Sequence, residues 1–96
     1  MKRNGYQVLT AVGLREAGEL LKQQTPHMIV MNCELPDGNG ITACRVLREK
    51  KLPVRVLLTS NDREDEVYAL DAGADDFVKK PYHVDVLLAR MKRLQA

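Results

Sequence analysis

Short apolar runs alternate along this chain with longer stretches in which apolar residues recur every three or four positions. Residues 6–10 (YQVLT) form the first run and predict a strand. From Leu14 to Leu21 the apolar spacing is helical, and Thr25-Pro26 predicts the end of that helix. A strand followed by a helix is the unit from which parallel sheets are built, so the pattern indicates an α/β domain.

A second unit repeats this order. Residues 27–31 (HMIVM) are apolar on both faces, as is typical of a buried strand in a parallel sheet. The segment ELPDGNG that follows is rich in turn residues, and Ile41, Cys44 and Leu47 mark the next helix.

In a third unit, residues 54–58 (VRVLL) predict a strand that begins after a proline. Asn61 or Asp62 is placed to cap the helix that follows, and Val67 and Leu70 predict its buried side. Acidic residues crowd the first turn of this helix, where the helix dipole favours negative charge.

A fourth unit completes the pattern. Gly73 predicts the end of the third helix, and residues 76–79 predict a short strand. Residues 83–95 predict a last helix, with apolar side chains at Val84, Leu87, Leu88, Met91 and Leu94. The four units together predict a doubly wound parallel sheet flanked by helices.

Composition narrows the class of protein. At 96 residues and 10.8 kDa the chain has the size of one domain. Its formal charge of +2 comes without a long basic run, which is too little to indicate binding to nucleic acid. No apolar stretch approaches the ~18 residues of a membrane-spanning helix, and no export signal is visible. We therefore expect a cytoplasmic protein that binds neither nucleic acid nor membranes.

The cysteines and histidines do not form a metal or nucleophile motif. Cys33 and Cys44 match no zinc spacing, and we do not expect a disulfide between them. A cysteine phosphatase loop would need an arginine six residues after Cys33, where the chain has Asn39. His27 and His83 have no paired ligand at metal spacing, so we expect no metal site in this chain.

Candidate chemistry gathers at the strand ends. Asn32, Thr59 and Lys80 each follow a predicted strand, and parallel strands end at one edge of their sheet. An amide, a hydroxyl and an ammonium group suit the binding of a phosphoryl group. Taken singly, the same residues have ordinary structural interpretations as a turn residue, a helix cap and a solvated charge. Phe77, in an apolar strand, is by itself a core residue.

Three segments of the chain, MIVMNCELPDGNG, VLLTSND and GADDFVKKPY, together resemble the receiver domain of bacterial two-component response regulators. GADDFVKKPY and LLARMKRL are most similar to regulators of the OmpR/PhoB type. The resemblance covers residues 1–96 and implies a flavodoxin-like receiver fold with strand order 2-1-3-4-5. A receiver normally opens with one more strand and an acidic pair, so the resemblance implies a receiver-like domain that is truncated at its N-terminus.

The resemblance also implies roles for individual residues. Asn32 stands at the position of the phospho-acceptor aspartate, and Thr59 and Lys80 match the residues that contact the phosphoryl group. Phe77 matches the aromatic residue of the switch, and the peptide bond before Pro81 is expected to be cis. In intact relatives the acceptor carboxylate and the acidic pair hold Mg²⁺. An amide is a poor nucleophile and a poor Mg²⁺ ligand, so we expect no cofactor and impaired phosphorylation here.

The same resemblance implies partners. Asp75, Asp76 and Arg90 match charged residues of the dimer face of OmpR/PhoB-type receivers. A sensor histidine kinase is the implied partner of an intact relative, and we expect a homo-oligomer. The absent first strand would stand between residues 6–10 and 27–31 and would leave two open sheet edges there. We expect either a rearranged sheet or association of chains through an edge.

The resulting hypothesis is a receiver domain, not an enzyme, in which phosphorylation is impaired. It would act in a phosphorelay that controls transcription through a DNA-binding domain outside this chain. The alternative is a pseudo-receiver that dimerises or binds a partner without a phosphate cycle. A small flavodoxin-like enzyme is a third hypothesis, but the sequence offers no matched acid, base and nucleophile for it.

Overall fold

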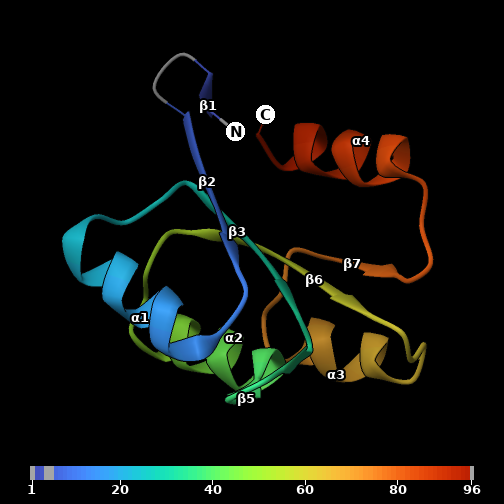
Figure 1. Ribbon diagram of the computed structural model, residues 1–96, viewed down its shortest axis with the longest axis horizontal. Helices are drawn as coiled ribbons and strands as arrows, with labels where there is room; N and C mark the ends of the chain where they lie inside the picture. The colour runs from blue at the N-terminus through green and yellow to red at the C-terminus, as the bar shows by residue number, and fades with distance from the viewer. Residues whose placement is uncertain (1, 4–5, 96) are drawn as a thin grey trace.

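A computed structural model describes residues 2–3 and 6–95 of the chain. In chain order its elements are β1 (Lys2–Arg3), β2 (Tyr6–Ala11), α1 (Leu14–Gln23), β3 (Met28–Asn32), β4 (Glu34–Leu35), β5 (Gly38–Asn39), α2 (Gly40–Glu49), β6 (Arg55–Ser60), α3 (Asp65–Asp71), β7 (Asp76–Lys79) and α4 (Val84–Gln95). The four strand–helix units expected from the apolar pattern are all present, and the prediction of an α/β fold is confirmed (Figure 1). Within the described residues, no helix is long and apolar enough to cross a membrane.

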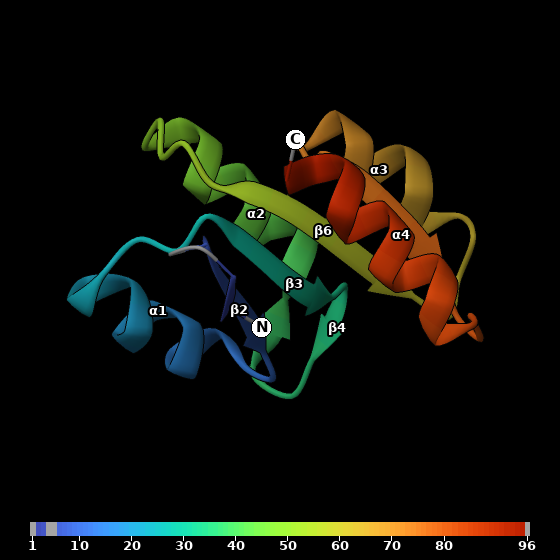
Figure 2. The same cartoon turned by 90° about the horizontal axis from the view of Figure 1, so that it is seen from above.

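The main sheet has the order β1-β2-β3-β6-β7. β2, β3, β6 and β7 are parallel to their neighbours, and the short β1 pairs antiparallel with β2 at one edge. β4 and β5 form a separate hairpin between β3 and α2. Because the main strands run the same way, their carboxyl ends meet at one edge of the sheet, as Figure 2 shows.

The expected gap between the first and second strands is absent from the structure. β2 pairs directly with β3, from Val8 opposite Met28 to Ala11 opposite Met31. The expectation of two open edges at this place is therefore wrong, and the rearranged sheet is the arrangement observed. The physical reason is that a buried strand needs hydrogen-bond partners for its backbone on both sides, and β2 supplies them to β3.

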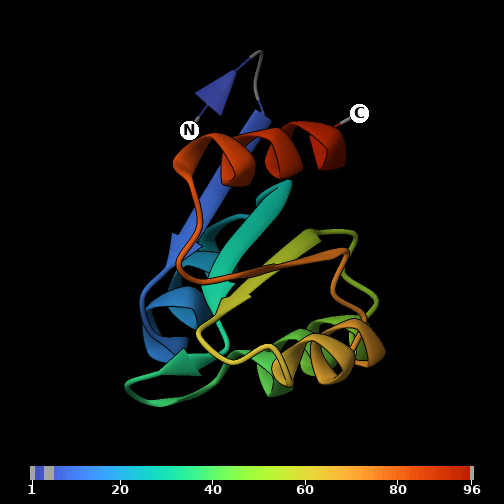
Figure 3. The same ribbon diagram turned by 90° about the vertical axis from the view of Figure 1, so that its right-hand side faces the viewer.

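The helices cover both faces of the sheet and make two cores (Figures 1 and 3). α1, α2 and α3 lie on one face, where Ile29 and Met31 of β3 belong to the larger core. α4 lies on the other face, over a smaller core that includes Met28 and Val30. Successive residues of a strand point to opposite faces, so the run of apolar residues in β3 serves both cores.

α3 buries a different side from the one that the apolar pattern predicts, and α4 buries only part of its predicted side. Val67 and Leu70 were expected on the buried side of α3 but are 64% and 47% exposed, and Ala69 is buried instead. In α4, Val84 and Leu88 are likewise exposed, while Leu87, Met91 and Leu94 contribute to the smaller core. α3 has only seven residues and lies against the edge strand β7, so it buries a narrow stripe, and helical spacing alone overestimates its core.

Arg48 of α2 joins several segments of the fold. Its guanidinium donates hydrogen bonds to the carbonyl oxygens of Gly73, Leu52 and Val54 and to the carboxylate of Asp75, at 2.8 Å for the last. The Asp75 carboxylate also accepts the backbone N–H of Val56 at 2.8 Å. The planar guanidinium thus links the end of α2, the start of β6 and the turn before β7.

We predict that Arg48→Ala destabilises the fold, because the Asp75 carboxylate and the carbonyl groups lose charged hydrogen bonds. The free energy of unfolding should fall by about 1–3 kcal/mol. Urea denaturation measures the change, and Arg45→Ala, an exposed arginine of the same helix, is the control. Equal stabilities for the two variants would show that the Arg48 network contributes nothing.

Candidate functional site

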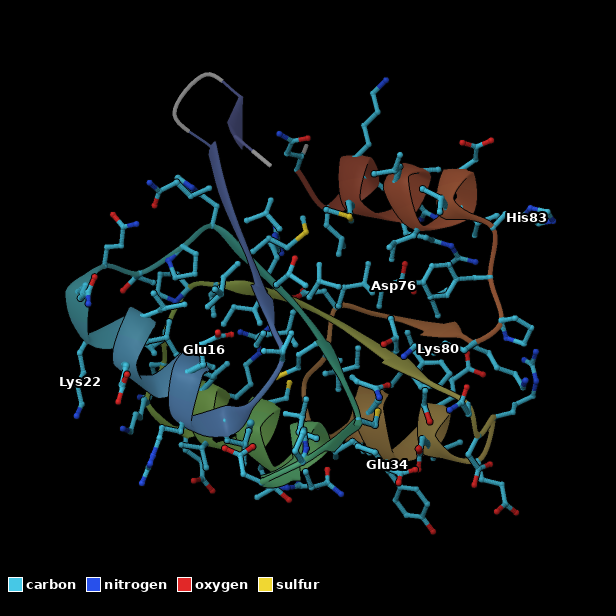
Figure 4. All side chains as sticks on the ribbon, viewed as in Figure 1. Glu16, Lys22, Glu34, Asp76, Lys80 and His83 are labelled. Atoms are coloured by element: carbon cyan, nitrogen blue, oxygen red, sulfur yellow. The ribbon has the colours of Figure 1, made fainter. Side chains whose placement is uncertain are left out.

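A cavity of about 340 Å³ opens at the carboxyl edge of the sheet. It is lined by Thr10, Ala11, Val12, Val30, Met31, Asn32, Glu34, Leu35, Pro36, Thr59, Lys80 and Tyr82. We call it the strand-end cavity. The structure brings together Asn32, Thr59 and Lys80, which come from three separate units of the chain. Glu34 and Lys80 are among the side chains labelled in Figure 4.

Strand register places Asn32 and Thr59 next to each other. Asn32, the last residue of β3, lies opposite Thr59 of β6. Their neighbours Val30 and Leu57 belong to the core under α4, and side chains two residues apart share a face. Both site residues therefore point to the α4 side of the sheet, and Thr59 is buried with 4% of its surface exposed.

The Asn32 amide is hydrogen-bonded at both ends. Its Oδ1 accepts the hydroxyl of Thr59 at 3.3 Å, and its Nδ2 donates to the backbone oxygen of Glu34 at 2.9 Å. A carboxylate at this position has no proton to donate to that carbonyl oxygen. The amide therefore fits its surroundings in a way that an ionised aspartate would not.

The start of α2 lies close against Asn32 because residue 40 is a glycine. The Gly40 N–H donates to the Cys33 oxygen at 2.8 Å, and a Cβ at Gly40 would collide with the Asn32 carbonyl oxygen. Asn39 caps the same helix, since its Oδ1 accepts the N–H groups of Ile41 and Thr42. These contacts fix the loop beside the strand-end cavity.

Lys80 supplies positive charge to the cavity. It is half-buried, and among the described residues its ammonium group forms no ion pair. The Lys80-Pro81 peptide bond is cis. The neighbouring Lys79 uses its ammonium differently, donating to the Lys80 backbone oxygen at 2.7 Å.

Phe77 does not line the strand-end cavity. In β7 it lies opposite Leu58, whereas Thr59 lies opposite Val78. Phe77 is buried in the core under α1, α2 and α3, on the face of the sheet opposite to the Thr59 side chain. A coupling between Phe77 and Thr59 stays a prediction from the resemblance.

Asp37, in the turn between β4 and β5, contacts another element of the fold. Its carboxylate accepts the N–H groups of Leu14 at 2.7 Å and Arg15 at 3.0 Å, and so caps α1. The residue before α1 is Gly13, which has no side chain to cap the helix. Local sequence pattern does not predict this contact, because 22 or more residues separate the partners.

The donors at the strand-end cavity do not fit a Mg²⁺ ion. Mg²⁺ is held through carboxylates, and the polar side chains here are an amide, the hydroxyls of Thr10, Thr59 and Tyr82, an ammonium group and the single carboxylate of Glu34. The Asn32 Oδ1 is already bonded to Thr59. In the described part of the chain, no three His, Cys, Asp or Glu side chains gather as metal ligands.

The two cysteines lie in the core as free thiols. Burial and the nearby Asp65 carboxylate raise the pKa of the Cys33 thiol to about 12, and burial raises the pKa of Cys44. Thiols held in this way are not nucleophiles near neutral pH. His27 belongs to the sheet, where its Nδ1 accepts the N–H of Gln7 at 2.9 Å, and His83 is exposed.

The charged residues expected on a dimer face are engaged within the chain. Asp75 pairs with Arg48 at 2.8 Å and with Arg55 at 3.5 Å. Arg90 of α4 pairs with Asp76 of β7 at 3.2 Å. Use of Asp75, Asp76 and Arg90 between chains stays a prediction.

Comparison with known proteins gives consistent matches. The family model of the response regulator receiver domain matches residues 1–92. Response regulator MprA of Mycolicibacterium vanbaalenii is 40% identical over 93 residues, which are 95% of this chain and 40% of that protein. The chain therefore spans less than half the length of this curated relative.

Solved structures match as well. DrrB of Thermotoga maritima, an OmpR/PhoB homolog, is 28% identical with a TM-score of 0.74, over 94% of this chain and 52% of its own. The beryllofluoride-activated dimer of the NtrC4 receiver domain is 28% identical with a TM-score of 0.77, over 88% of this chain and 71% of its own. The expected receiver fold is confirmed.

We predict that the Asp37 cap loses its stabilising effect in acid. The N–H groups of Arg15 and Leu14 lower the pKa of Asp37 below its usual 3.8. Because the pKa of Asp37 is lower in the folded state, its ionised carboxylate stabilises the fold above pH 3.8. This stabilisation is lost as the pH falls through the pKa of the folded state. Asp37→Asn should therefore destabilise the protein at about pH 6 and have a smaller effect at about pH 2.5.

Urea denaturation of both proteins at the two pH values measures this difference. Asp71→Asn, which changes an exposed carboxylate at the end of α3, is the control. A destabilisation by Asp37→Asn that is equal at both pH values would contradict the charge-based cap.

Proposed function

The chain belongs to the response regulator receiver domain family, and we propose that it is a receiver whose Asn32 does not accept phosphate. Its partner is a sensor histidine kinase, and its role lies in two-component signalling that controls transcription. DNA would be bound by a domain outside these residues; the chain's match to only 40% of MprA is compatible with that arrangement.

The hydrogen bonds of Asn32 carry this proposal. Transfer of a phosphoryl group requires a nucleophilic oxygen, and an amide oxygen is neutral and weakly nucleophilic. Here that oxygen also accepts the hydroxyl of Thr59, the side chain that would contact a phosphoryl group. The side chains of Asn32 and Thr59 thus form a hydrogen bond with each other, and Lys80 supplies positive charge to the cavity.

Among the described residues that line the strand-end cavity, no set of groups is suited to catalytic turnover, which supports a regulatory role. The strand-end cavity combines Thr59, Lys80 and Glu34 but no activated nucleophile, because the Thr59 hydroxyl donates to Asn32 rather than to a base. The proposal is therefore of a module that responds to a partner and not of an enzyme.

A second function, dimerisation without a phosphate cycle, is favoured by the surface around β7. Large apolar residues of α3 and α4 are exposed: Val67, Tyr68, Leu70, Val84, Val86 and Leu88. β7 is the outer strand of the sheet between these helices, as Figure 3 shows. We call this surface the α3–β7–α4 face. Apolar groups gathered beside an open strand edge are typical of a protein interface.

We predict that the chain gains no phosphoryl group from acetyl phosphate and Mg²⁺, because position 32 has no carboxylate. Intact mass, measured before and after incubation, reads the result. Asn32→Asp is the test variant. Asn61→Asp, which makes the same amide-to-carboxylate change at an exposed residue, is the control. A labile phosphoryl group on the unchanged chain would contradict the proposal.

The same variant tests the structural role of the amide. Asn32→Asp loses the bond to the Glu34 carbonyl, so it should lower the free energy of unfolding by about 0.5–1.5 kcal/mol. A phosphoryl group on Asn32→Asp alone would assign the loss of phosphorylation to this amide. If neither protein is modified, the phosphorylation-independent function is favoured.

We predict that association through the α3–β7–α4 face is sensitive to charge. Val67→Glu places a carboxylate on an apolar surface and should shift the chain toward the monomer, as measured by light scattering at micromolar concentration. Val46→Glu is the matched control, because Val46 is an exposed valine of α2. A monomeric unchanged chain, or equal effects of the two variants, would argue against this face.

A further inference from the structure

α1 and α2 lie on the face of the sheet opposite α4 (Figures 1 and 2). Side chains of both helices line an apolar groove. The groove has a volume of about 490 Å³, and we call it the α1–α2 groove. Ile29 and Met31 of β3, which are buried, line it from the sheet, and Leu21 and Val46 line it from the helices. Cavities of this size with a mainly apolar lining are typical of small-molecule sites.

Small residues keep the groove open. Ala17 and Gly18 of α1 and Ala43 of α2 all contribute to its lining. A Cβ at Gly18 would meet no atom within 4 Å. Protein interiors are normally close-packed, but the groove is an open space among apolar side chains. One of these side chains, Val46, is 41% exposed. An apolar ligand seated here would cover that surface.

The charged residues that line the groove are both basic. Lys22 and Lys50 are its charged lining residues, and in the described part of the chain no acidic residue lines it. Lys22 lies in the last turn of α1 and Lys50 follows α2. Both helices run antiparallel to the strands of the parallel sheet, so their carboxyl ends lie at the same end of the groove. Figure 4 labels Lys22 at the outer end of α1.

We propose that the α1–α2 groove binds a small molecule with an apolar body and one carboxylate, such as a medium-chain fatty acid. The body contacts the apolar lining, and the carboxylate lies between the ammonium groups of Lys22 and Lys50. The lysine stems are long enough to reach a carboxylate at the rim while their ammonium groups stay in water. This inference is separate from the proposed function, because it does not depend on Asn32, Thr59 or Lys80.

Titration of the ¹⁵N-labelled protein with octanoate tests the inference, with 1-octanol as the uncharged probe. Octanoate should shift the amide signals of Gly18, Leu21, Ala43 and Val46, and it should bind more tightly than 1-octanol. Gly18→Leu fills the groove and should abolish the shifts from both probes. Leucine is a better helix former than glycine, so this variant is expected to fold.

Alanine substitutions test whether Lys22 and Lys50 bind the carboxylate. Combined Lys22→Ala and Lys50→Ala should weaken octanoate binding about three- to tenfold and leave 1-octanol binding unchanged. Lys92→Ala, on α4 across the sheet, is the matched control and should change neither. The inference is overturned if octanoate shifts only signals of the α3–β7–α4 face, if Gly18→Leu leaves binding intact, or if the lysine pair has no effect.

Discussion

The parallel pairing of β3 with β6 is the constraint on which the site depends. It places Asn32 opposite Thr59, on the face of the sheet that also carries Val30 and Leu57. A shift of one residue in this register would send the Asn32 and Thr59 side chains to opposite faces. The buried side chains of β3 on both faces make such a shift costly, so the two cores hold the strand-end cavity in place.

Direct pairing of β2 with β3 completes that constraint. The carboxyl ends of β2, β3, β6 and β7 then lie side by side. Thr10 and Ala11 of β2 close the cavity on one side. The hairpin of β4 and β5 closes another side, because Asn32 bonds to the Glu34 backbone and Asp37 bonds to the start of α1. One short loop is therefore tied to the site and to the first helix at once.

Local pattern predicted much of this fold from sequence. β7 has the predicted bounds, Asp76–Lys79, and the three site residues at the strand ends share one cavity. The pattern could not predict contacts between distant segments, such as the Asp37 cap, whose partners are 22 and 23 residues away. It also misjudged Val67, because helical spacing identifies an apolar side but not how much sheet that side meets. The parallel strands follow the order that the resemblance implies once its first strand is left out, but β2 pairs directly with β3 where a gap was expected, since pairing is a property of the whole sheet.

We propose for Asn32 a neutral, hydrogen-bonded role in place of a phospho-acceptor. The most direct measurement is the amide spectrum of the ¹⁵N-labelled chain with and without beryllofluoride and Mg²⁺. Beryllofluoride attaches to a carboxylate oxygen with the tetrahedral shape of a phosphoryl group. The account predicts unchanged signals for Asn32, Thr59 and Lys80. Saturable shifts of these three signals would contradict it.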